Sequence, residues 1–306
     1  MDIGNEIPDS IYQYRVMSIQ HLRELQENFE TLDSQGKISN HPVFRSYIDE
    51  KQHQLPESFP EAKSVIVMAV FTPMMTVDFH YQGKIHAIQV SHYYEDGITE
   101  DQLKSTILNK IIGDNQYRVE NAKMHVLLKR LAVRTGLGKY GRNNICYVDG
   151  MGSFLKLFAF FTDFSFDEDN WKDAEMMESC KNCRVCRTQC PTGAISEDNF
   201  VIDVEKCIPL YNEVPGEFPD WIDSSSHNAL MGCLRCQLPC PANSEVVKKG
   251  QKLDPISEEE TRKILDGSSD DELYLSLSEK LRMFIPEHAY YYFPVITRNL
   301  RVLIRE

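Results

Sequence analysis

Eight of the nine cysteines in this 306-residue chain fall within 61 residues, and their spacing constrains the fold more than any hydrophobic pattern. A first run, Cys-x2-Cys-x2-Cys-x3-Cys-Pro, extends from Cys180 to Pro191. A second run, Cys-x2-Cys-x3-Cys-Pro, extends from Cys233 to Pro241, and Cys207 lies between the two runs. The first spacing is that of bacterial ferredoxins, in which thiolates wrap around cubes of iron and sulfur.

Two [4Fe–4S] clusters account for all eight of these cysteines. In a two-cluster ferredoxin the fourth cysteine of a run binds the other cube, because the chain reverses before it. We therefore assign Cys180, Cys183, Cys186 and Cys240 to cluster one, and Cys190, Cys207, Cys233 and Cys236 to cluster two. The ninth, Cys146, lies in an apolar run and is expected to be a small buried side chain.

Zinc and disulfides are the alternatives for such a segment. Two Cys-x2-Cys pairs can form a tetrahedral zinc site, but that site would leave four cysteines without a role. A disulfide framework belongs to oxidising compartments, whereas the N-terminal sequence MDIGNEIPDS is acidic and unlike a secretory signal. No apolar stretch approaches the ~18 residues of a membrane helix. We expect a cytoplasmic protein.

The charge of the chain is acidic but unevenly distributed. It has 33 Lys and Arg against 46 Asp and Glu, a formal net charge of −13. That balance argues against a simple nucleic-acid binder. Residues 101–150 are the exception, with nine basic and four acidic side chains. Such a basic segment is either a solvated face or a wall that holds an anionic ligand.

Hydrophobic periodicity predicts mixed helices and strands before the cysteine segment, and the length suggests about two domains. The expected helices cover residues 10–30, 100–112, 119–135 and 257–285, the last capped by Ser257. The expected strands cover residues 64–70, 84–91, 144–148 and 154–161. Residues 33–62 are expected to be mostly loop with one short helix.

The sequence GLGKYG at residues 136–141 satisfies the pattern G-x-G-x-x-G. The dinucleotide fingerprint needs a strand before the glycines and a helix after them. Here the expected order is the reverse, so we exclude nicotinamide cofactor binding and interpret Gly136 as the end of a helix. Glycines also allow a close approach of the backbone to another group. A plain helix–strand connection is the alternative.

The segment LAVRTGLGKYGRNNICYVDGMGSFLKL, residues 131–157, followed by the cysteine runs and by RCQLPCPAN at 235–243, resembles the epoxyqueuosine reductase family. The resemblance covers about residues 62–245. Members share an architecture with reductive dehalogenases, so the resemblance implies an α+β fold. A nitroreductase-like α/β domain that binds base-off cobalamin would occupy 1–165, a two-cluster ferredoxin-like domain 166–250, and a helical C-terminal extension 251–306.

The resemblance also implies site residues. The residues expected to line the corrin are Gly136, Gly138, Lys139, Gly141, Arg142, Asn143, Gly152 and Ser153. An aspartate of the family, used as proton donor, would fall at Ala122, so we consider other groups for that role. The catalytic candidates are Tyr93, Tyr94, Glu120 and His125.

A ferredoxin-like module fills less than half of the chain, so the remainder must serve a further cofactor or partner. The leading hypothesis is a cobalamin-dependent reductase, an oxidoreductase that receives electrons from an external ferredoxin or flavodoxin and reductively cleaves a C–O or C–halogen type bond. Its substrate would be a small molecule or modified nucleoside, with tRNA as a further candidate partner. The alternatives are a corrinoid-free electron-transfer protein and a reductive activator of another corrinoid protein.

Overall fold

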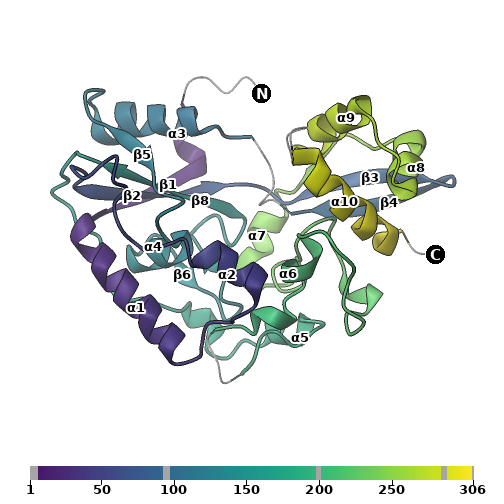
Figure 1. Cartoon of the computed structure of the whole chain (residues 1–306), viewed down its shortest axis with the longest axis horizontal. Coiled ribbons are helices and arrows are strands. Elements are labelled where there is room, and N and C mark those ends of the chain that lie inside the picture. The colour runs from purple at the N-terminus through teal and green to yellow at the C-terminus, as the bar shows by residue number, and fades with distance from the viewer. Residues whose placement is uncertain (1–5, 92–96, 198–200, 284–287, 305–306) are drawn as a thin grey trace. The chain divides into compact units, whose positions relative to one another are not determined.

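The structure, a computed structural model, describes residues 6–91, 97–197, 201–283 and 288–304. The chain forms two compact units, each built from two separate stretches (Figure 1). The first unit consists of Met1–Phe71 and Ile98–Cys183, and the second of Thr72–Gly97 and Arg184–Glu306. Within the described residues, none of the helices has both the length and the apolar character needed to cross a membrane.

The first unit is built on an antiparallel sheet in the order β1-β2-β8-β5. Its strands are β1 (Tyr12–Ser18), β2 (Ser64–Phe71), β8 (Leu155–Thr162) and β5 (Val119–Asn121). Alternate side chains of β2 belong to two different hydrophobic clusters, one on each face of the sheet. Because both faces are covered, the sequence of β2 is an uninterrupted apolar run.

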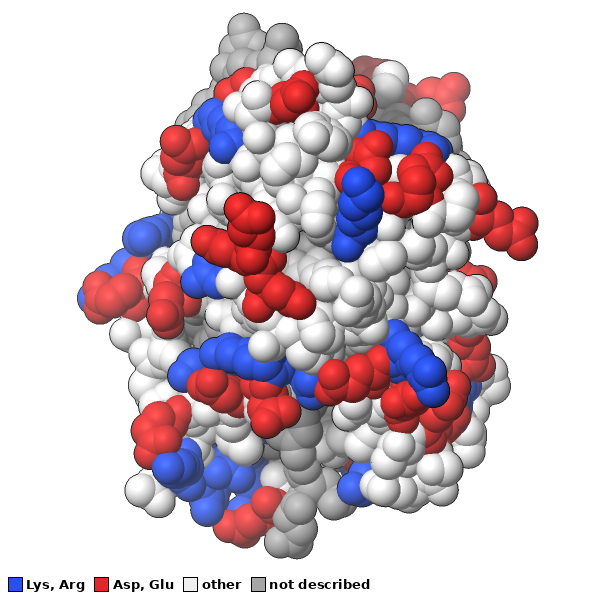
Figure 2. Space-filling view, turned by 90° about the vertical axis from the view of Figure 1, so that its left-hand side faces the viewer, with Lys and Arg blue, Asp and Glu red and all other residues white. Residues whose placement is uncertain are grey.

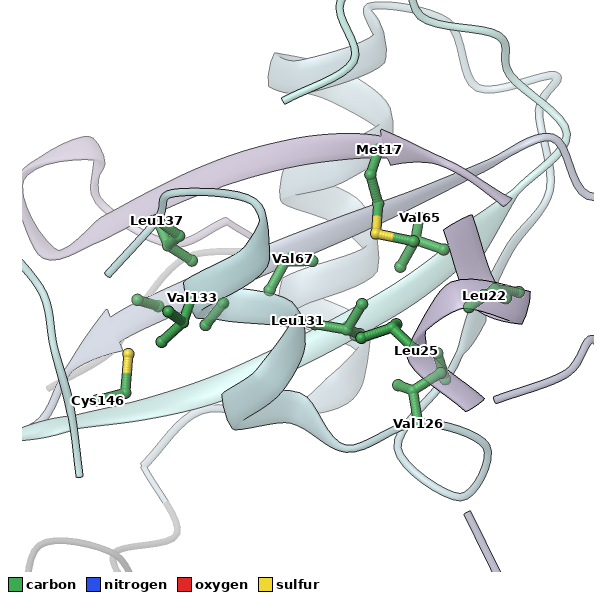
Figure 3. Close-up of a cluster of buried hydrophobic side chains, with 14 of the residues drawn as sticks. Met17, Leu22, Leu25, Val65, Val67, Val126, Leu131, Val133, Leu137 and Cys146 are labelled. Carbon is green, nitrogen blue, oxygen red and sulfur yellow. The ribbon is translucent and has the colours of Figure 1, made fainter. Parts of the chain in front are cut away.

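Helices cover the two faces of this sheet. On one face α1 (Leu22–Ser34) and α4 (Leu128–Arg134) contribute to the buried cluster shown in Figure 3. On the other, α3 (Glu100–Thr106) continues into the π-helical turn η4 (Ile107–Ile112). The remaining elements of this unit are η1 (Asp9–Ile11), η2 (Ile19–His21), α2 (Pro42–Ile48), β6 (Lys139–Tyr140), β7 (Cys146–Tyr147) and η5 (Glu178–Cys180).

The second unit combines a small sheet with three longer helices. The sheet order is β4-β3-β9, and its strands are β3 (Met75–Tyr81), β4 (Lys84–Val90) and β9 (Gln251–Lys252). Its apolar side chains share one cluster with those of the C-terminal helices. The helices and turns are α5 (Val185–Gln189), η6 (Val204–Lys206), α6 (Pro209–Asn212), η7 (Ser224–Ser226), η8 (Pro241–Asn243), α7 (Ser244–Val247), α8 (Glu258–Asp266), α9 (Asp271–Leu281) and α10 (Ala289–Leu303).

Most of the predicted elements are present. Strands occupy 64–71, 84–90 and 155–162, and 100–112 is helical throughout. Ser257 caps α8 through a capping box with Glu260, as its sequence position predicts. The predicted strand at 144–148 is reduced to β7, which pairs with β6 in a separate two-stranded sheet.

Three predicted helices were wrong in part, and one of them, 257–285, is divided into α8 and α9 after Gly267 ends the first. Residues 12–18 form β1 rather than the start of a helix, because the aromatic and β-branched side chains of YQYRV suit a strand paired with β2. Residues 119–121 form β5, and the helix predicted from 119 begins only at Leu128. The side chain of Asn121 accepts a hydrogen bond from the Lys123 amide at 2.8 Å, which turns the chain out of the strand.

The division into units also differs from the predicted boundaries at 165 and 250. The hairpin of β3 and β4 belongs to the second unit, although 1–165 was expected to be one domain. The reason is packing, since Met75, Val77 and Phe79 share their hydrophobic cluster with the C-terminal helices. The β3 strand itself, MTVDFHY, was not predicted.

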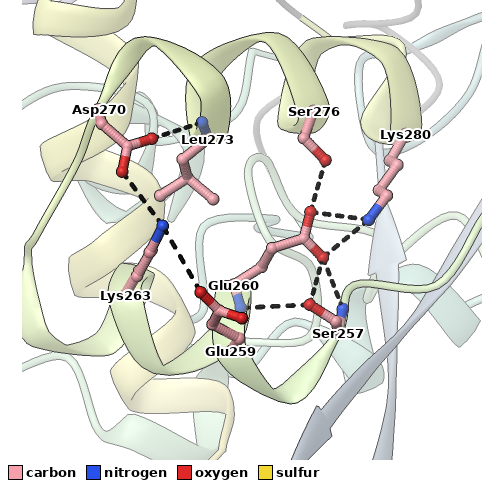
Figure 4. A network of polar contacts seen from close by, with 8 residues as sticks. All are labelled: Ser257, Glu259, Glu260, Lys263, Asp270, Leu273, Ser276 and Lys280. Carbon is pink, nitrogen blue, oxygen red and sulfur yellow. Dashed lines mark hydrogen bonds and ion pairs between the residues drawn. The ribbon is translucent and has the colours of Figure 1, made fainter.

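A charged network joins α8 to α9 in the second unit (Figure 4). Glu260 accepts hydrogen bonds from Lys280 Nζ at 2.7 Å, from Ser257 Oγ at 2.6 Å and from Ser276. Burial alone would raise the pKa of Glu260, but these hydrogen bonds outweigh it and lower the pKa to about 2. The ordinary value is 4.5, so the carboxylate stabilises the fold above that pH and loses its contribution as the pH falls toward 2.

We predict that Glu260→Gln lowers the free energy of unfolding by about 2 kcal/mol at pH 7, because hydrogen bonds to a charged acceptor are lost. The difference from the parent protein should shrink between pH 4.5 and pH 3. Thermal unfolding followed by circular dichroism across this range measures it. Glu259→Gln is the control, since Glu259 is exposed and only approaches Lys263 at 3.8 Å. Equal losses in the two variants would contradict the prediction.

Candidate cluster site and glycine loop

Four of the cysteine thiols gather in the second unit. Burial raises the pKa of Cys207, and the neighbouring thiols of Cys236, Cys233 and Cys190 raise it further. Burial likewise raises the pKa of Cys233 to about 11, with a smaller contribution from Cys190. Cys207 therefore lies within electrostatic range of the other three thiols, and Cys233 lies within range of Cys190. These four are the cysteines that the spacing assigns to cluster two, and they come from three separate segments of the chain.

The chemistry of this donor set fits an iron–sulfur cube. Thiols that are buried together resist ionisation, because thiolates desolvate poorly and repel one another. Iron bound to all of them would remove that penalty, since metal-bound cysteine is deprotonated. All nine cysteines lie in the described residues, and none forms a disulfide bond. The described residues contain no group of three or more His, Cys, Asp or Glu placed to hold a single metal ion.

Local backbone geometry explains the cysteine–proline pairs. Cys190 follows α5 in an extended conformation, and Cys240 is extended before η8, which begins at Pro241. Proline fixes the backbone for the first turn of a helix and cannot continue the preceding one. The first Cys-Pro pair therefore follows the end of one short helix, and the second precedes the start of another.

Two cysteines of the predicted cluster one lie at the end of the first unit, next to the glycine loop. Arg142 donates from Nη2 to the Cys180 carbonyl at 2.7 Å and from Nε to the Cys183 carbonyl at 3.1 Å. One side chain thus holds both ends of the first Cys-x2-Cys turn. The other two predicted ligands, Cys186 and Cys240, belong to the second unit.

Three glycines of the loop are required by packing within the protein. Gly136 follows α4 with φ +69°, which confirms its role as the residue that ends the helix. A Cβ on Gly138 would lie 2.5 Å from Cys146 Sγ and 2.8 Å from the Tyr147 carbonyl oxygen. A Cβ on Gly141 would lie 2.5 Å from the Tyr147 ring. Gly138 and Gly141 therefore allow the loop to pack directly against strand β7.

Several residues predicted to line a corrin use their side chains within the protein. Lys139 forms an ion pair with Glu175 at 2.7 Å, and Asn143 is 3% exposed and donates to the Tyr147 hydroxyl at 3.0 Å. The backbone amides of Gly138 and Gly141 also donate within the protein, to the carbonyls of Ala132 and Ile145. The predicted lining residues do form one continuous segment of the first unit.

The end of that segment and Cys146 are buried as well. The Gly152 carbonyl accepts a hydrogen bond from the Val148 amide at 2.9 Å, and Ser153 is 3% exposed. Cys146 packs in the hydrophobic cluster of the first unit, and burial raises its pKa to about 12. The expectation of a small buried side chain is confirmed.

The basic segment 101–150 is largely neutralised by carboxylates from elsewhere. Acidic and basic side chains alternate over the face of the molecule shown in Figure 2. Five of the nine basic residues form ion pairs, which are Lys104–Glu100, Lys110–Asp9, Arg118–Glu61, Arg134–Glu24 and Lys139–Glu175. Surface pairs of this kind contribute little stability, but they remove the net positive charge that a polyanion would need.

Arg130 is different from these. It is partly buried on α4, and in the described part of the chain it forms no hydrogen bond or ion pair through its side chain. Burial lowers its pKa, Tyr140 of the glycine loop raises it, and Arg134 lowers it. A guanidinium that is buried without an anion is unfavourable. Sequence reasoning missed Arg130 as a separate residue, because only the total charge of its segment was visible.

The predicted catalytic residues have ordinary surroundings where they are described. Glu120 on β5 forms an ion pair with Arg118, and the ring of His125 packs edge-on against Phe161 at a centroid distance of 5.9 Å. Ala122 has no exposed surface and belongs to the hydrophobic core. Tyr93 and Tyr94 lie outside the described residues.

Known proteins resemble this chain in sequence. Residues 179–243 match the family model of a 4Fe-4S double cluster binding domain. Over 190 residues the chain is 33% identical to an epoxyqueuosine reductase of Cyclobacterium marinum, covering 60% of this chain and 59% of that protein. It is 34% identical over 119 residues to the Escherichia coli epoxyqueuosine reductase, covering 39% of this chain and 30% of that one. The chain thus matches at most three fifths of the length of these relatives.

Solved structures resemble it in fold. A selenomethionine-labelled epoxyqueuosine reductase superposes with a TM-score of 0.68 at 19% identity, over 96% of this chain and 77% of that one. The epoxyqueuosine reductase of Streptococcus thermophilus superposes with a TM-score of 0.63 at 18% identity, with the same coverage. The predicted α+β architecture is confirmed.

The fold and the cysteine segment define a protein of mixed α and β structure with a double [4Fe–4S] cluster binding domain. In sequence and in fold, the chain is similar to epoxyqueuosine reductases.

We predict that Arg142→Gln weakens the binding of the cluster that Cys180 and Cys183 ligate, because two hydrogen bonds to the turn between them are lost. Iron should fall by at least one quarter from the parent content of about eight per chain. Iron analysis and EPR of the reduced protein measure this. Lys139→Gln is the control on the same loop, since its partner is an exposed carboxylate. Unchanged iron and EPR in Arg142→Gln would contradict the role of the guanidinium.

Proposed function

We propose that this chain is a cobalamin-dependent iron–sulfur reductase. The observation that carries the proposal is that Cys190, Cys233 and Cys236 lie close enough to Cys207 to raise its pKa, as ligands of one cluster would. Sequence similarity to an epoxyqueuosine reductase over 190 residues supplies the second support. Cys180, Cys183, Cys186 and Cys240 complete the proposal as ligands of cluster one, on their spacing.

The first unit offers one feature that fits cobalamin. Base-off cobalamin carries a phosphate in its nucleotide loop, and Arg130 is a partly buried cation with no carboxylate bound to it among the described residues. Arg130 lies on α4, which ends directly before the glycine loop. Arg130 would hold the phosphate, and the loop would support the ring.

When bound, the clusters and the cobalt centre would supply electrons singly for reductive cleavage of a C–O or C–halogen bond. The chain's own residues would hold these groups, exclude water and provide a proton for the leaving atom. Glu120 is engaged by Arg118 and His125 is packed against Phe161, so neither is preferred as the donor. Tyr93 and Tyr94 therefore remain our candidates. Single Phe variants of both that keep full turnover would remove them.

The substrate is the least constrained part of the proposal. A solved relative has been described with an epoxyqueuosine-modified tRNA stem loop. In this chain most cations of the segment 101–150 are ion-paired, which leaves few charges for phosphate contacts along an RNA backbone. We therefore favour a small molecule or a modified nucleoside over intact tRNA. A cytoplasmic location fits the reduced thiols, and the electron donor would be an external low-potential carrier.

We predict that the anaerobically purified, reconstituted protein contains about eight irons per chain and binds hydroxocobalamin with a base-off spectrum. Arg130→Gln should weaken cobalamin binding at least fivefold and leave the iron content unchanged, because it removes the cation proposed to face the phosphate. Titration followed by absorbance measures both. Lys123→Gln, which removes an exposed lysine of the same segment, is the control.

Other results would decide against this function. Full iron content without cobalamin binding would favour the corrinoid-free electron-transfer protein or the activator of another corrinoid protein. In EPR, Cys180→Ala and Cys207→Ala should remove different signals. Loss of the same signal from both variants would refute the ligand assignment.

A further inference from the structure

The 25 residues between Cys207 and Cys233 form a loop whose ends are joined by a buried side chain. Asn212 has no exposed surface, and its Nδ2 donates to the Gly232 carbonyl at 2.6 Å. Its Oδ1 accepts from the Gly232 amide at 3.2 Å. The side-chain amide thus pairs with the backbone as a neighbouring strand would. It does so five residues after one proposed cluster ligand and one residue before another.

The C-terminal helix α10 holds both ends of this loop. Asn299, 1% exposed, donates from Nδ2 to the Asn212 carbonyl at 2.7 Å and to the Leu230 carbonyl at 2.8 Å. The Leu230 amide in turn donates to the Gln89 carbonyl of β4 at 2.8 Å. One side chain therefore bridges the segment that follows Cys207 and the segment that precedes Cys233.

Arg298 extends the same contact. Its Nη2 donates to the Tyr211 carbonyl at 3.1 Å, and its Nη1 to the Val214 carbonyl at 3.1 Å. Its Nε also donates to Asn299 Oδ1 at 3.1 Å, so the guanidinium fixes the orientation of that amide. The guanidinium lies over the Phe218 ring at 4.0 Å from its centroid.

A physical cost opposes the site that these residues surround. The loop loses conformational entropy when its ends are brought together. Gly232 adds a steric condition, because it has φ +76° and a Cβ there would lie 3.3 Å from Glu213 Oε1. A fixed external support would offset this cost before iron arrives.

We infer that Asn299 and Arg298 are positioning residues for cluster two. They hold the segments of Cys207 and Cys233 close enough for one cube to bind both thiolates. The inference rests on the proposed function, in which these cysteines ligate cluster two. Cluster one has a different support, because Cys180 and Cys183 are held through Arg142. Damage to α10 at this point should therefore remove one cluster and leave the other.

The test is Asn299→Asp in the full chain, reconstituted anaerobically. The variant has the same size but places an oxygen against the carbonyls of Asn212 and Leu230. Iron should fall from about eight to about four per chain, and the EPR signal that Cys207→Ala removes should be lost. The signal that Cys180→Ala removes should remain. Arg301→Gln is the control on the same helix, since its guanidinium donates to the Leu265 carbonyl at 2.8 Å, outside the loop.

Two results would overturn the inference. Retention of both signals in Asn299→Asp would show that the bridge is not needed. Loss of both would show that α10 supports the whole fold and not one cluster. A milder variant, Arg298→Lys, should make cluster two decay in air at least threefold faster relative to cluster one, and equal relative rates would count against the pair. Parent protein with fewer than eight irons would instead refute the proposed function.

Discussion

The second unit is arranged around cysteine thiols that must ionise in order to bind iron. Charged groups brought together away from water oppose folding unless a counter-charge joins them. Cys207 would be in this situation as a thiolate, because burial and the neighbouring Cys236, Cys233 and Cys190 raise its pKa. The sheet of β3, β4 and β9 and the helices α8 to α10 supply the apolar burial that a cysteine-rich segment lacks. The cysteine segment therefore depends on this hydrophobic core and on the two iron–sulfur clusters proposed for it.

The first unit meets a different requirement, because it must support a loop. Strand β2 is covered on both faces, which makes the sheet a rigid base for α4 and the glycine loop. Gly138 and Gly141 let that loop lie directly on β7, and Arg142 extends from it to the Cys180–Cys183 turn. The hydrogen bonds of Arg142 thus fix the Cys180–Cys183 turn relative to the sheet.

Sequence reasoning succeeded where chemistry depends on local spacing. Cysteine runs and the apolar strand β2 are visible in one short window, and the capping box at Ser257 needs only four residues. It failed for β1, whose tyrosines and valine fit helical and strand periods equally well. It also failed at Val119, which was predicted to begin a helix and instead begins strand β5. Asn212 and Asn299 were invisible, because they are 87 residues apart and neither belongs to a motif. Partners of that kind are set by tertiary packing.

The second unit is made from two stretches of chain, Thr72–Gly97 and Arg184–Glu306. During synthesis the hairpin of β3 and β4 leaves the ribosome long before β9, at Gln251, is made. At ordinary rates of translation that interval is about ten to thirty seconds. The helices that share its hydrophobic cluster come later still. Throughout that interval the apolar side chains of the nascent hairpin lack the partners that bury them in the finished unit.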